Sequence, residues 1–303
     1  MKTKNKTMNS SSGRARRVIP ISFQLAGFGL NLISLIHNEW PARVLGKLWF
    51  TVFKSKPKQW VNEFWQQADE TISLQLLDQT LPIYRWGQGP LVVLMHGWSG
   101  SGTQFRYFIP TLVAAGYQVI TFDAPAHGKN HGKQTHLLEF SQTLSAIQQQ
   151  VGEVNTVIAH SLGAMAAAFA IQQDLKTQHL IMMAPHLDVQ RIFESYRQLL
   201  SLRPALAKRF HDLVGQKMYA ILDQQDPWAL FKPATLLNHK MPSGMMVYDH
   251  EDEEVDAALF KEIEVTWKDC TSLKTMGLGH NGILKDKAVI QSVLAYLCEK
   301  RRP

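Results

Sequence analysis

The strongest constraint on the fold is an alternation of short apolar stretches with segments of helical periodicity from residue 70 onward. The predicted strands span residues 71–77, 81–87, 91–95, 118–122, 156–158, 179–183, 245–248 and 271–275. The predicted helices span residues 104–115, 137–151, 164–170 and 287–300. Strands that alternate with helices in this way form an α/β fold, a mainly parallel sheet with helices on both faces. The first two strands are close enough in sequence to form a hairpin.

The alternation breaks once, between residues 188 and 241, where the pattern is helical and no strand is predicted. In a parallel sheet, ligands bind at the carboxyl ends of the strands, so an insertion of this length predicts a helical cap over the site. We expect Phe193 and Tyr196 of this cap to contact a substrate. The competing interpretation is that the aromatic residues of the insertion only form the core of the cap. Residues 70–187 and 242–303 form the core domain.

The residues before the alternation form a basic N-terminal segment. Residues 1–58 contain eleven Lys or Arg and one acidic residue, so this segment carries +10, and the rest of the chain, from a total of +7, carries −3. A slightly acidic body does not predict a nucleic-acid surface. We expect residues 1–17 to be a disordered basic tail and residues 18–69 to form a helical arm.

The first predicted helix of this arm, residues 18–36, is strongly apolar but carries a narrow polar stripe. The stripe consists of Gln24, Gly27, Asn31, Ser34 and Asn38, at helical spacings of three and four. Three interpretations remain open: packing against the body or a partner, lying on a membrane surface with the help of the basic residues, or a true anchor or signal. A second helix is predicted over residues 41–53.

The composition narrows the chemistry and the compartment. Cys270 and Cys298 are the only cysteines, too few for a disulfide scaffold, so a reducing compartment is expected. We therefore predict a cytoplasmic protein, with membrane association through residues 18–36 left open. The histidines lack ligand spacing with acids or cysteines, and no phosphate-binding Gly-rich motif is present. Neither a metal nor a cofactor is expected, and the sequence carries no signal for an oligomeric state.

Ser161 is the first candidate for catalysis, because it lies where the predicted strand of residues 156–158 turns into the helix of residues 164–170. A serine at such a turn occupies a strained backbone position and projects its hydroxyl out of the sheet. The strand and helix crowd together there, so small residues are needed two positions before and after the serine, and Ala159 and Gly163 fit. A serine at a helix start is also a common cap, and the motif alone does not decide between cap and nucleophile.

A serine nucleophile needs a base, and the base needs an acid that holds its tautomer. His280 follows the last predicted strand in a loop with three glycines, which lets its imidazole fold back over the sheet. The alternative is an ordinary surface histidine. The acid is expected in residues 249–255, directly after the strand of residues 245–248. This run contains several acids, and from the residues alone both Asp249 and Asp252 remain candidates.

The order of these motifs, with His96-Gly97 after a strand, then the elbow serine, a later acid and a histidine after the last strand, resembles the α/β-hydrolase superfamily. The resemblance covers roughly residues 71–300. It implies the α/β-hydrolase fold, with the helical insertion as a lid, and a serine esterase. It also selects Asp252 as the acid, with Asp249 in reserve.

The resemblance further implies acyl transfer. Ser161 would attack an acyl carbon, His280 would move the proton and Asp252 would orient the imidazole. The N–H groups of Trp98 and Leu162 would stabilise the oxyanion. Besides the two cap aromatics, the residues implied at the substrate site are His96, Gly97 and His160.

The expected reaction is hydrolysis of a small or medium ester-like molecule with an apolar part. On the same triad, transfer of the acyl group to another acceptor, cleavage of a C–C bond and perhydrolysis remain alternatives, as does a non-catalytic ligand-binding role. Dehalogenases and epoxide hydrolases of the superfamily resemble this chain in layout but use Asp at the elbow. Ser161 argues against them.

Overall fold

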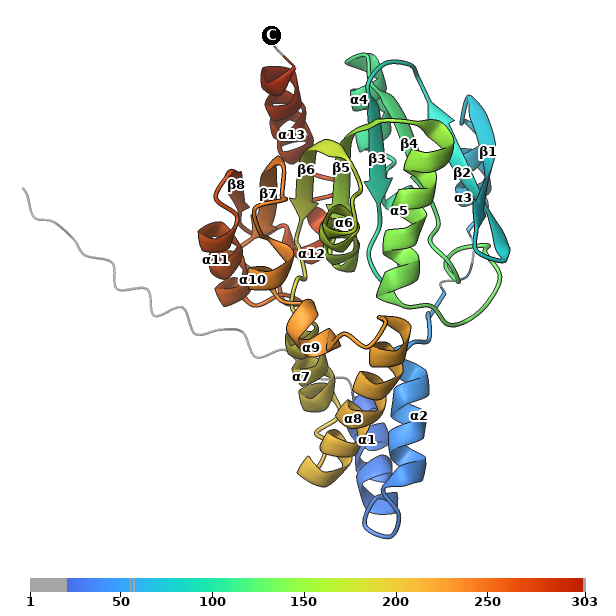
Figure 1. The fold of residues 1–303 in the computed structure, drawn as a ribbon, viewed down its shortest axis with the longest axis vertical. Coiled ribbons are helices and arrows are strands. Elements are labelled where there is room, and N and C mark those ends of the chain that lie inside the picture. The colour runs from blue at the N-terminus through green and yellow to red at the C-terminus, as the bar shows by residue number, and fades with distance from the viewer. Residues whose placement is uncertain (1–20, 55, 57, 302–303) are drawn as a thin grey trace, which may run out of the picture.

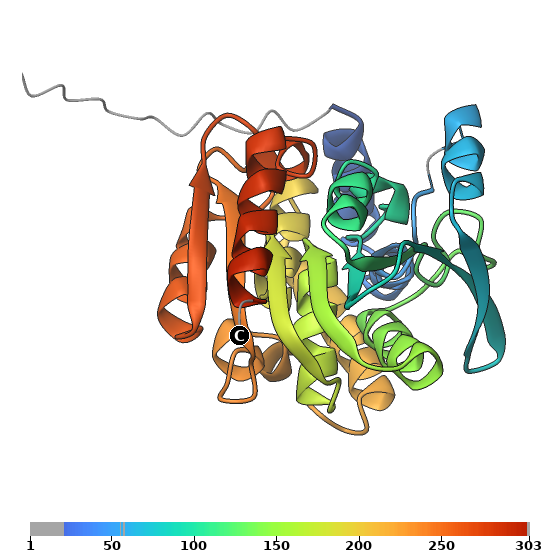
Figure 2. The same cartoon turned by 90° about the horizontal axis from the view of Figure 1, so that it is seen from above.

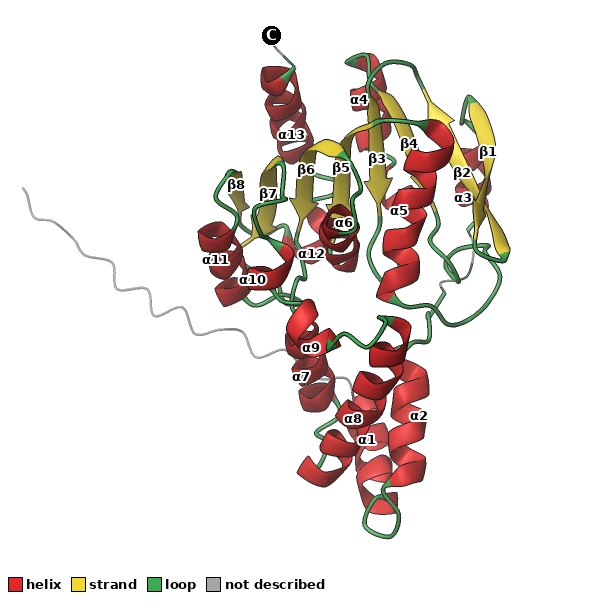
Figure 3. Ribbon diagram, viewed as in Figure 1, coloured by secondary structure: helices red, strands yellow, loops and turns green. Residues whose placement is uncertain are grey.

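The computed structural model describes residues 21–54, 56 and 58–301, and the predicted disordered tail of residues 1–17 lies outside the described residues. One eight-stranded sheet runs through the molecule (Figures 1 and 3). Its strands are β1 (Glu70–Leu76), β2 (Gln79–Trp86), β3 (Leu91–Met95), β4 (Gln118–Phe122), β5 (Val154–His160), β6 (Thr177–Met183), β7 (Ser243–Asp249) and β8 (Cys270–Thr275). Each predicted strand is therefore present.

The order of the strands in the sheet is β1-β2-β4-β3-β5-β6-β7-β8. β1 pairs with β2 and β2 pairs with β4 in antiparallel register, whereas the pairs that follow in this order are parallel. The mainly parallel sheet and the hairpin predicted for the first two strands are confirmed. β3 is buried along its whole length, because a parallel sheet carries helices on both faces.

Helices cover both faces of the sheet (Figure 2). One face carries α5 (Leu137–Val151), α6 (Leu162–Gln172) and α11 (Ala257–Thr266). The other carries α3 (Gln59–Gln66), α4 (Phe108–Ala114) and α13 (Lys287–Lys300). Successive side chains of a strand point to opposite faces, so the sheet contributes to two cores. Val93 and Met95 of β3 belong to the first core, whereas Val92 and Leu94 belong to the second.

The helix predicted over residues 104–115 is instead two elements. A 3₁₀ turn, η1 (Gly102–Phe105), precedes α4. Pro110 is the third residue of α4. Its missing N–H costs no helical hydrogen bond in the first turn but would break the helix further inside. The proline therefore fixes the start of α4 near Phe108.

The cap lies beyond the carboxyl ends of the parallel strands (Figure 1). It contains α7 (Val189–Leu199), α8 (Pro204–Ile221) and α9 (Pro227–Leu230) of the predicted insertion, together with α1 (Ile21–Ile33) and α2 (Glu39–Trp49). The Trp49 ring lies between 5.3 and 6.2 Å from the rings of Phe193, Tyr196 and Phe210. The first two helices of the predicted arm thus pack with the helices of the insertion.

The last part of the predicted arm (18–69) and the last part of the predicted cap (188–241) both pack on the core domain. The last helix of the arm, α3, packs on the sheet, where Trp65 stacks on Tyr84 with ring centroids 4.1 Å apart. α10 (Pro233–Leu236), near the end of the insertion, packs against α6 and α11. The Gln172 side chain of α6 donates a hydrogen bond to the Leu236 carbonyl (2.9 Å).

The apolar stretch predicted as a helix over residues 18–36 forms the 13-residue α1, and residues 18–20 lie outside the described residues. The middle of its polar stripe faces the cap, where the Asn31 side chain donates to the Ser201 carbonyl (2.9 Å). Packing against the body, one of the three interpretations, is therefore observed. Within the described part of the chain, no helix is long and apolar enough to cross a membrane.

Candidate active site

Ser161 lies between β5 and α6 with φ 53° and ψ −121°, a backbone conformation that few residues other than glycine adopt. The close approach of neighbouring backbones explains the small residues around it. A Cβ on Gly163 would lie 2.5 Å from the His96 carbonyl oxygen, and a Cβ on Gly97 would lie 2.9 Å from the Ser161 Cβ. Ser161 borders a cavity, as expected for a serine that the strained turn pushes out of the sheet.

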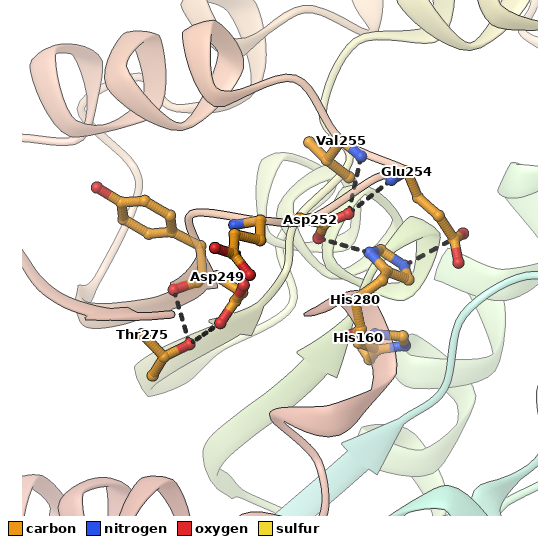
Figure 4. A network of polar contacts seen from close by, with 9 residues as sticks. His160, Asp249, Asp252, Glu254, Val255, Thr275 and His280 are labelled. Atoms are coloured by element: carbon orange, nitrogen blue, oxygen red, sulfur yellow. Dashed lines mark hydrogen bonds and ion pairs between the residues drawn. The ribbon is translucent and has the colours of Figure 1, made fainter. Parts of the chain in front are cut away.

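His280 lines the same cavity. It lies in α12 (Gly279–Gly282), just after β8, where Gly277 and Gly279 have φ 80° and 63°. Its Nδ1 is hydrogen-bonded to Oδ2 of Asp252 at 2.8 Å (Figure 4). Both side chains are nearly completely buried. The pair leaves Nε2 of His280 available on the cavity side, 3.7 Å from the Glu254 carboxylate.

The two candidate acids have different partners (Figure 4). The second oxygen of Asp252 accepts the N–H groups of Glu254 and Val255 at 2.8 and 3.0 Å, which fixes the carboxylate toward His280. Asp249 instead accepts hydrogen bonds from the Thr275 hydroxyl (2.7 Å) and the N–H of Leu278 (3.0 Å). The structure therefore brings Asp252, and not Asp249, to the imidazole.

Asp249 has a different task, which is to connect the loops after β7 and β8. Although its burial disfavours the charged form, hydrogen bonds from Thr275 and from backbone N–H groups, Leu278 among them, hold the pKa of Asp249 below its usual range. An ionised Asp249 thus anchors the loop that carries His280. Asp249 is therefore a residue that positions the loop of His280.

The two predicted oxyanion donors border the cavity on the Ser161 side. Leu162 is the first residue of α6, and the first N–H groups of a helix have no intrahelical partner and a positive local potential. Trp98 follows His96-Gly97 at the end of β3. The next residue, Ser99, donates its N–H to Nε2 of His127 at 2.9 Å, which holds this loop in place.

His96 does not line the cavity among the described residues, contrary to the prediction that it contacts substrate. It is completely buried under the loops, where Nδ1–H donates to the Gly97 carbonyl (2.7 Å) and Nε2 accepts the N–H of Ala124 (2.9 Å). Burial lowers the pKa of His96 to about 4 and that of His127 to about 3. Both imidazoles are therefore neutral, and their hydrogen bonds hold the surrounding loops in place.

His160 lines the cavity next to the base. Its Nε2–H donates to the backbone carbonyl of His280 (3.0 Å), and the two rings lie 4.7 Å apart. Burial lowers the pKa of His160 to about 3 and that of His186, which follows β6 and also borders the cavity, to about 4. The cavity is thus bordered by neutral imidazoles.

The cavity has a volume of about 460 Å³, and its far wall belongs to the cap. Of the two predicted cap contacts, Tyr196 lines it, whereas Phe193 packs inside the cap against Phe210 and Trp228. The lining residues that were not among the predicted site residues include Trp49, Phe50, His186, Val214, Met218, Trp228, Phe231 and Glu254. For Trp49 the signal was its place on the apolar face of the helix predicted over residues 41–53.

In the part of the chain that the structure describes, no cluster of three or more His, Cys, Asp or Glu side chains could hold a metal ion. The polar residues that border the cavity include the serines Ser99, Ser161 and Ser195, several histidines, the Glu254 carboxylate, and the side chains of Gln104, Tyr196 and Asn281. This set suits nucleophilic and acid–base chemistry at a carbonyl group.

A model of the alpha/beta hydrolase family matches residues 92–291. The chain is also similar to epoxide hydrolase B of Mycobacterium tuberculosis, with 37% identity over 87 residues. The matched segment is 29% of this chain and 22% of that relative, so the chain spans about a fifth of the length of the curated relative it matches.

Solved structures share the fold over most of this chain. An esterase from Exiguobacterium antarcticum is 17% identical with a TM-score of 0.56, covering 76% of this chain and 100% of its own. Est1E from Butyrivibrio proteoclasticus, solved with ferulic acid bound, is 16% identical with a TM-score of 0.59, covering 75% of this chain and 98% of its own. At such identities the likeness concerns the fold.

Proposed function

Since the chain belongs to the alpha/beta hydrolase family, we propose that it is a serine hydrolase that cleaves carboxylic esters of small or medium apolar molecules. The observation that carries the proposal is the meeting of the strained Ser161 and the His280–Asp252 pair at one cavity. The serine is exposed to a ligand there, and the imidazole already has the partner that a general base requires.

In the proposed reaction, the Ser161 Oγ attacks the acyl carbon while Nε2 of His280 takes its proton. The N–H groups of Trp98 and Leu162 stabilise the negative oxygen of the tetrahedral intermediate. The intermediate collapses to an acyl-enzyme, and His280 returns the proton to the departing alcohol. Water then attacks the acyl group by the same route, which releases the acid and restores Ser161.

The Ser161–His280 contact is the step that substrate binding has to complete. Among the described residues, the Ser161 hydroxyl makes no hydrogen bond to His280, and Glu254 lies 3.7 Å from Nε2 instead. Contacts of this kind are commonly longer in the free enzyme and shorten in the complex. An acyl group seated against the oxyanion donors brings the hydroxyl and Nε2 together.

The cavity supports an apolar substrate. Apolar side chains of the cap, such as Val214, Met218 and Phe231, form much of its lining. The bordering imidazoles of His160 and His186 are neutral, since burial lowers their pKa values. A negatively charged acyl chain would lose its hydration there without gaining a cationic partner, and the Glu254 carboxylate at the cavity would repel it, so we expect acyl groups of medium length without a negative charge.

Epoxide hydrolysis is the second candidate, because the curated relative bears that name. In this chemistry a carboxylate opens the epoxide and forms an ester, which water can hydrolyse. A serine at the elbow would form an ether instead, and water does not cleave an ether under mild conditions. Ser161 therefore favours ester cleavage over epoxide opening.

The test is hydrolysis of p-nitrophenyl butyrate combined with labelling by a fluorophosphonate. We expect turnover, labelling at Ser161, and a loss of ~10³-fold or more in kcat in Ser161→Ala. Ser195→Ala is the matched control: Ser195 also lines the cavity, but its hydroxyl donates to the Arg191 carbonyl within α7. A folded protein that neither hydrolyses the ester nor reacts with the probe would contradict the proposal.

A further inference from the structure

The outward face of α1 is apolar and uncovered within the described part of the chain. The exposed fractions of Ile21, Leu25, Phe28 and Leu32 are 73%, 66%, 68% and 55%. These residues follow one another at intervals of four, three and four, so they form one stripe along the helix. A continuous apolar stripe of this kind is typical of a surface that meets a partner or a membrane.

The opposite face of α1 fixes this orientation. A Cβ on Gly27 would lie 1.9 Å from the Leu200 carbonyl oxygen, so the helix touches the cap backbone there. The Asn31 side chain donates to the Ser201 carbonyl and accepts the N–H of Arg203, both at 2.9 Å. Hydrogen bonds are directional. The helix is thus held with its polar stripe inward and its apolar stripe outward.

Three further large apolar side chains are exposed in the sequence just after α1. Leu35, Ile36 and Trp40 have exposed fractions of 62%, 93% and 56%. Tryptophan prefers the boundary between water and lipid, because its ring is apolar and its N–H is polar. We call the seven exposed side chains of Ile21, Leu25, Phe28, Leu32, Leu35, Ile36 and Trp40 the α1 patch.

The charge of the sequence that precedes α1 indicates which kind of partner the α1 patch binds. The sequence that precedes α1, residues 1–17, contains no acid and six basic residues, which are Lys2, Lys4, Lys6, Arg14, Arg16 and Arg17. An apolar helix face next to clustered basic residues is typical of segments that bind anionic lipid surfaces.

We propose that the α1 patch docks this protein on the surface of a bilayer that contains anionic phospholipids. α1 lies in the interface and its apolar side chains enter the acyl region, while the positive charge of the preceding sequence favours an anionic surface. The cap helix α2, which contacts α1, ends at the cavity-lining Trp49. Docking would thus bring one wall of the cavity close to the lipid surface.

The test is co-sedimentation of the full-length protein with vesicles of phosphatidylcholine that contain about one third of phosphatidylglycerol. We expect binding, and a loss of about tenfold or more in the partition coefficient in Leu25→Gln/Phe28→Gln, since two apolar side chains leave the lipid. The matched control is Leu77→Gln/Val265→Gln, at residues of similar exposure (70% and 74%) on the core domain. This control should bind like the wild type.

Lipid composition and self-association complete the test. Pure phosphatidylcholine vesicles and high salt should both weaken binding, because they remove or screen the attraction of the basic residues. Equal binding of the Leu25→Gln/Phe28→Gln and wild-type proteins would overturn the proposal. A dimer in sedimentation velocity that this variant abolishes, without any vesicle binding, would overturn it as well. Ser161→Ala should bind vesicles normally, so the result does not depend on the proposed hydrolase activity.

Discussion

The two walls of the cavity are held in place by different interactions. The strand-end wall comprises the loops that follow β3, β4, β5, β6, β7 and β8, and buried polar groups connect loops of this wall. For example, Asp123 accepts hydrogen bonds from the Ser101 hydroxyl (2.7 Å) and the N–H of Gly102 (3.0 Å). The cap wall consists of α2, α7, α8 and α9, and it is joined mainly by rings and aliphatic side chains, as the contacts of Trp49 illustrate.

This difference indicates a division of tasks. Hydrogen bonds fix atoms in direction as well as distance, which a catalytic group requires, whereas apolar packing tolerates changes in shape at modest cost. We therefore expect substitutions in the strand-end wall to affect kcat and acid stability. Substitutions in the cap wall should affect substrate choice and the attachment of the cap helices.

The largest expected effect is at the acid of the strand-end wall. Asp252→Asn should lower kcat by about 10⁴-fold, because an amide cannot stabilise the imidazolium and can turn the wrong atom toward Nδ1 of His280. Asp249→Asn is the matched control. It loosens the loop that carries His280 but leaves the 2.8 Å pair between Asp252 and His280. Steady-state kinetics with p-nitrophenyl butyrate measure the kcat of both variants. Equal losses of kcat would show that Asp252 and Asp249 do not have the different roles described above.

The second effect is acid sensitivity of the strand-end wall. His96, His127, His160 and His186 have pKa values of about 4, 3, 3 and 4 in the folded protein because burial disfavours the charged imidazole. The ordinary pKa is about 6.5, so between pH 6.5 and 4 the unfolded chain binds more protons than the folded one. The free energy of unfolding should therefore fall as the pH falls, by up to about 5.6 kcal/mol per pH unit for four imidazoles at ~1.4 kcal/mol each.

Denaturant titrations at several pH values between 7 and 5 measure this slope, in a range around the ordinary imidazole pKa of about 6.5. His127→Gln should flatten the slope by about 1.4 kcal/mol per pH unit, since one buried imidazole is removed. His250→Gln is the control, because His250 is exposed and should leave the slope unchanged. A slope that does not respond to His127→Gln would place the acid sensitivity elsewhere in the molecule.

The strand-end wall was largely predictable from the sequence because its constraints are local. The turn at Ser161 needs a small residue at position 163 within two residues of the serine, and the loop at His280 needs its own glycines. Such local requirements produce short motifs that can be recognised in the sequence. The choice of Asp252 over Asp249 was less local, since it depends on which carboxylate of the loop after β7 reaches an imidazole 28 residues further along the chain. The resemblance, not the spacing, selected it.

The composition of the cap wall was not predictable for the opposite reason. Trp49 and Phe210 belong to helices more than 150 residues apart, and apolar periodicity shows that a helix buries a face without showing what covers that face. The same applies to α1. Its polar stripe was visible in the sequence, but only the contacts of Gly27 and Asn31 show that this stripe faces the cap.

The attachment of α1 to the cap provides the third prediction. Gly27→Ala places a methyl group against the Leu200 carbonyl and should destabilise α1 by about 1–3 kcal/mol. Gly29→Ala is a matched control on the same helix, because nothing lies within 4 Å of its Cβ. It should stabilise α1 by up to about 1 kcal/mol through helix propensity. Hydrogen exchange of residues 21–33 measures both, and faster exchange in Gly29→Ala would contradict the packing.

The smallest expected effect is substrate choice at the cap wall. Trp49→Ala enlarges the cavity where α2 meets α7, so it should raise the ratio of kcat/KM for p-nitrophenyl decanoate over butyrate by about 3- to 10-fold, a change of ~1 kcal/mol. Trp60→Ala is the control, because Trp60 is an exposed tryptophan on α3, outside the cavity. The kcat for the short ester should stay close to that of the wild type, since the strand-end wall is unchanged. A large loss of kcat in Trp49→Ala would instead show that the two walls are coupled and that the cap helps to place the catalytic groups.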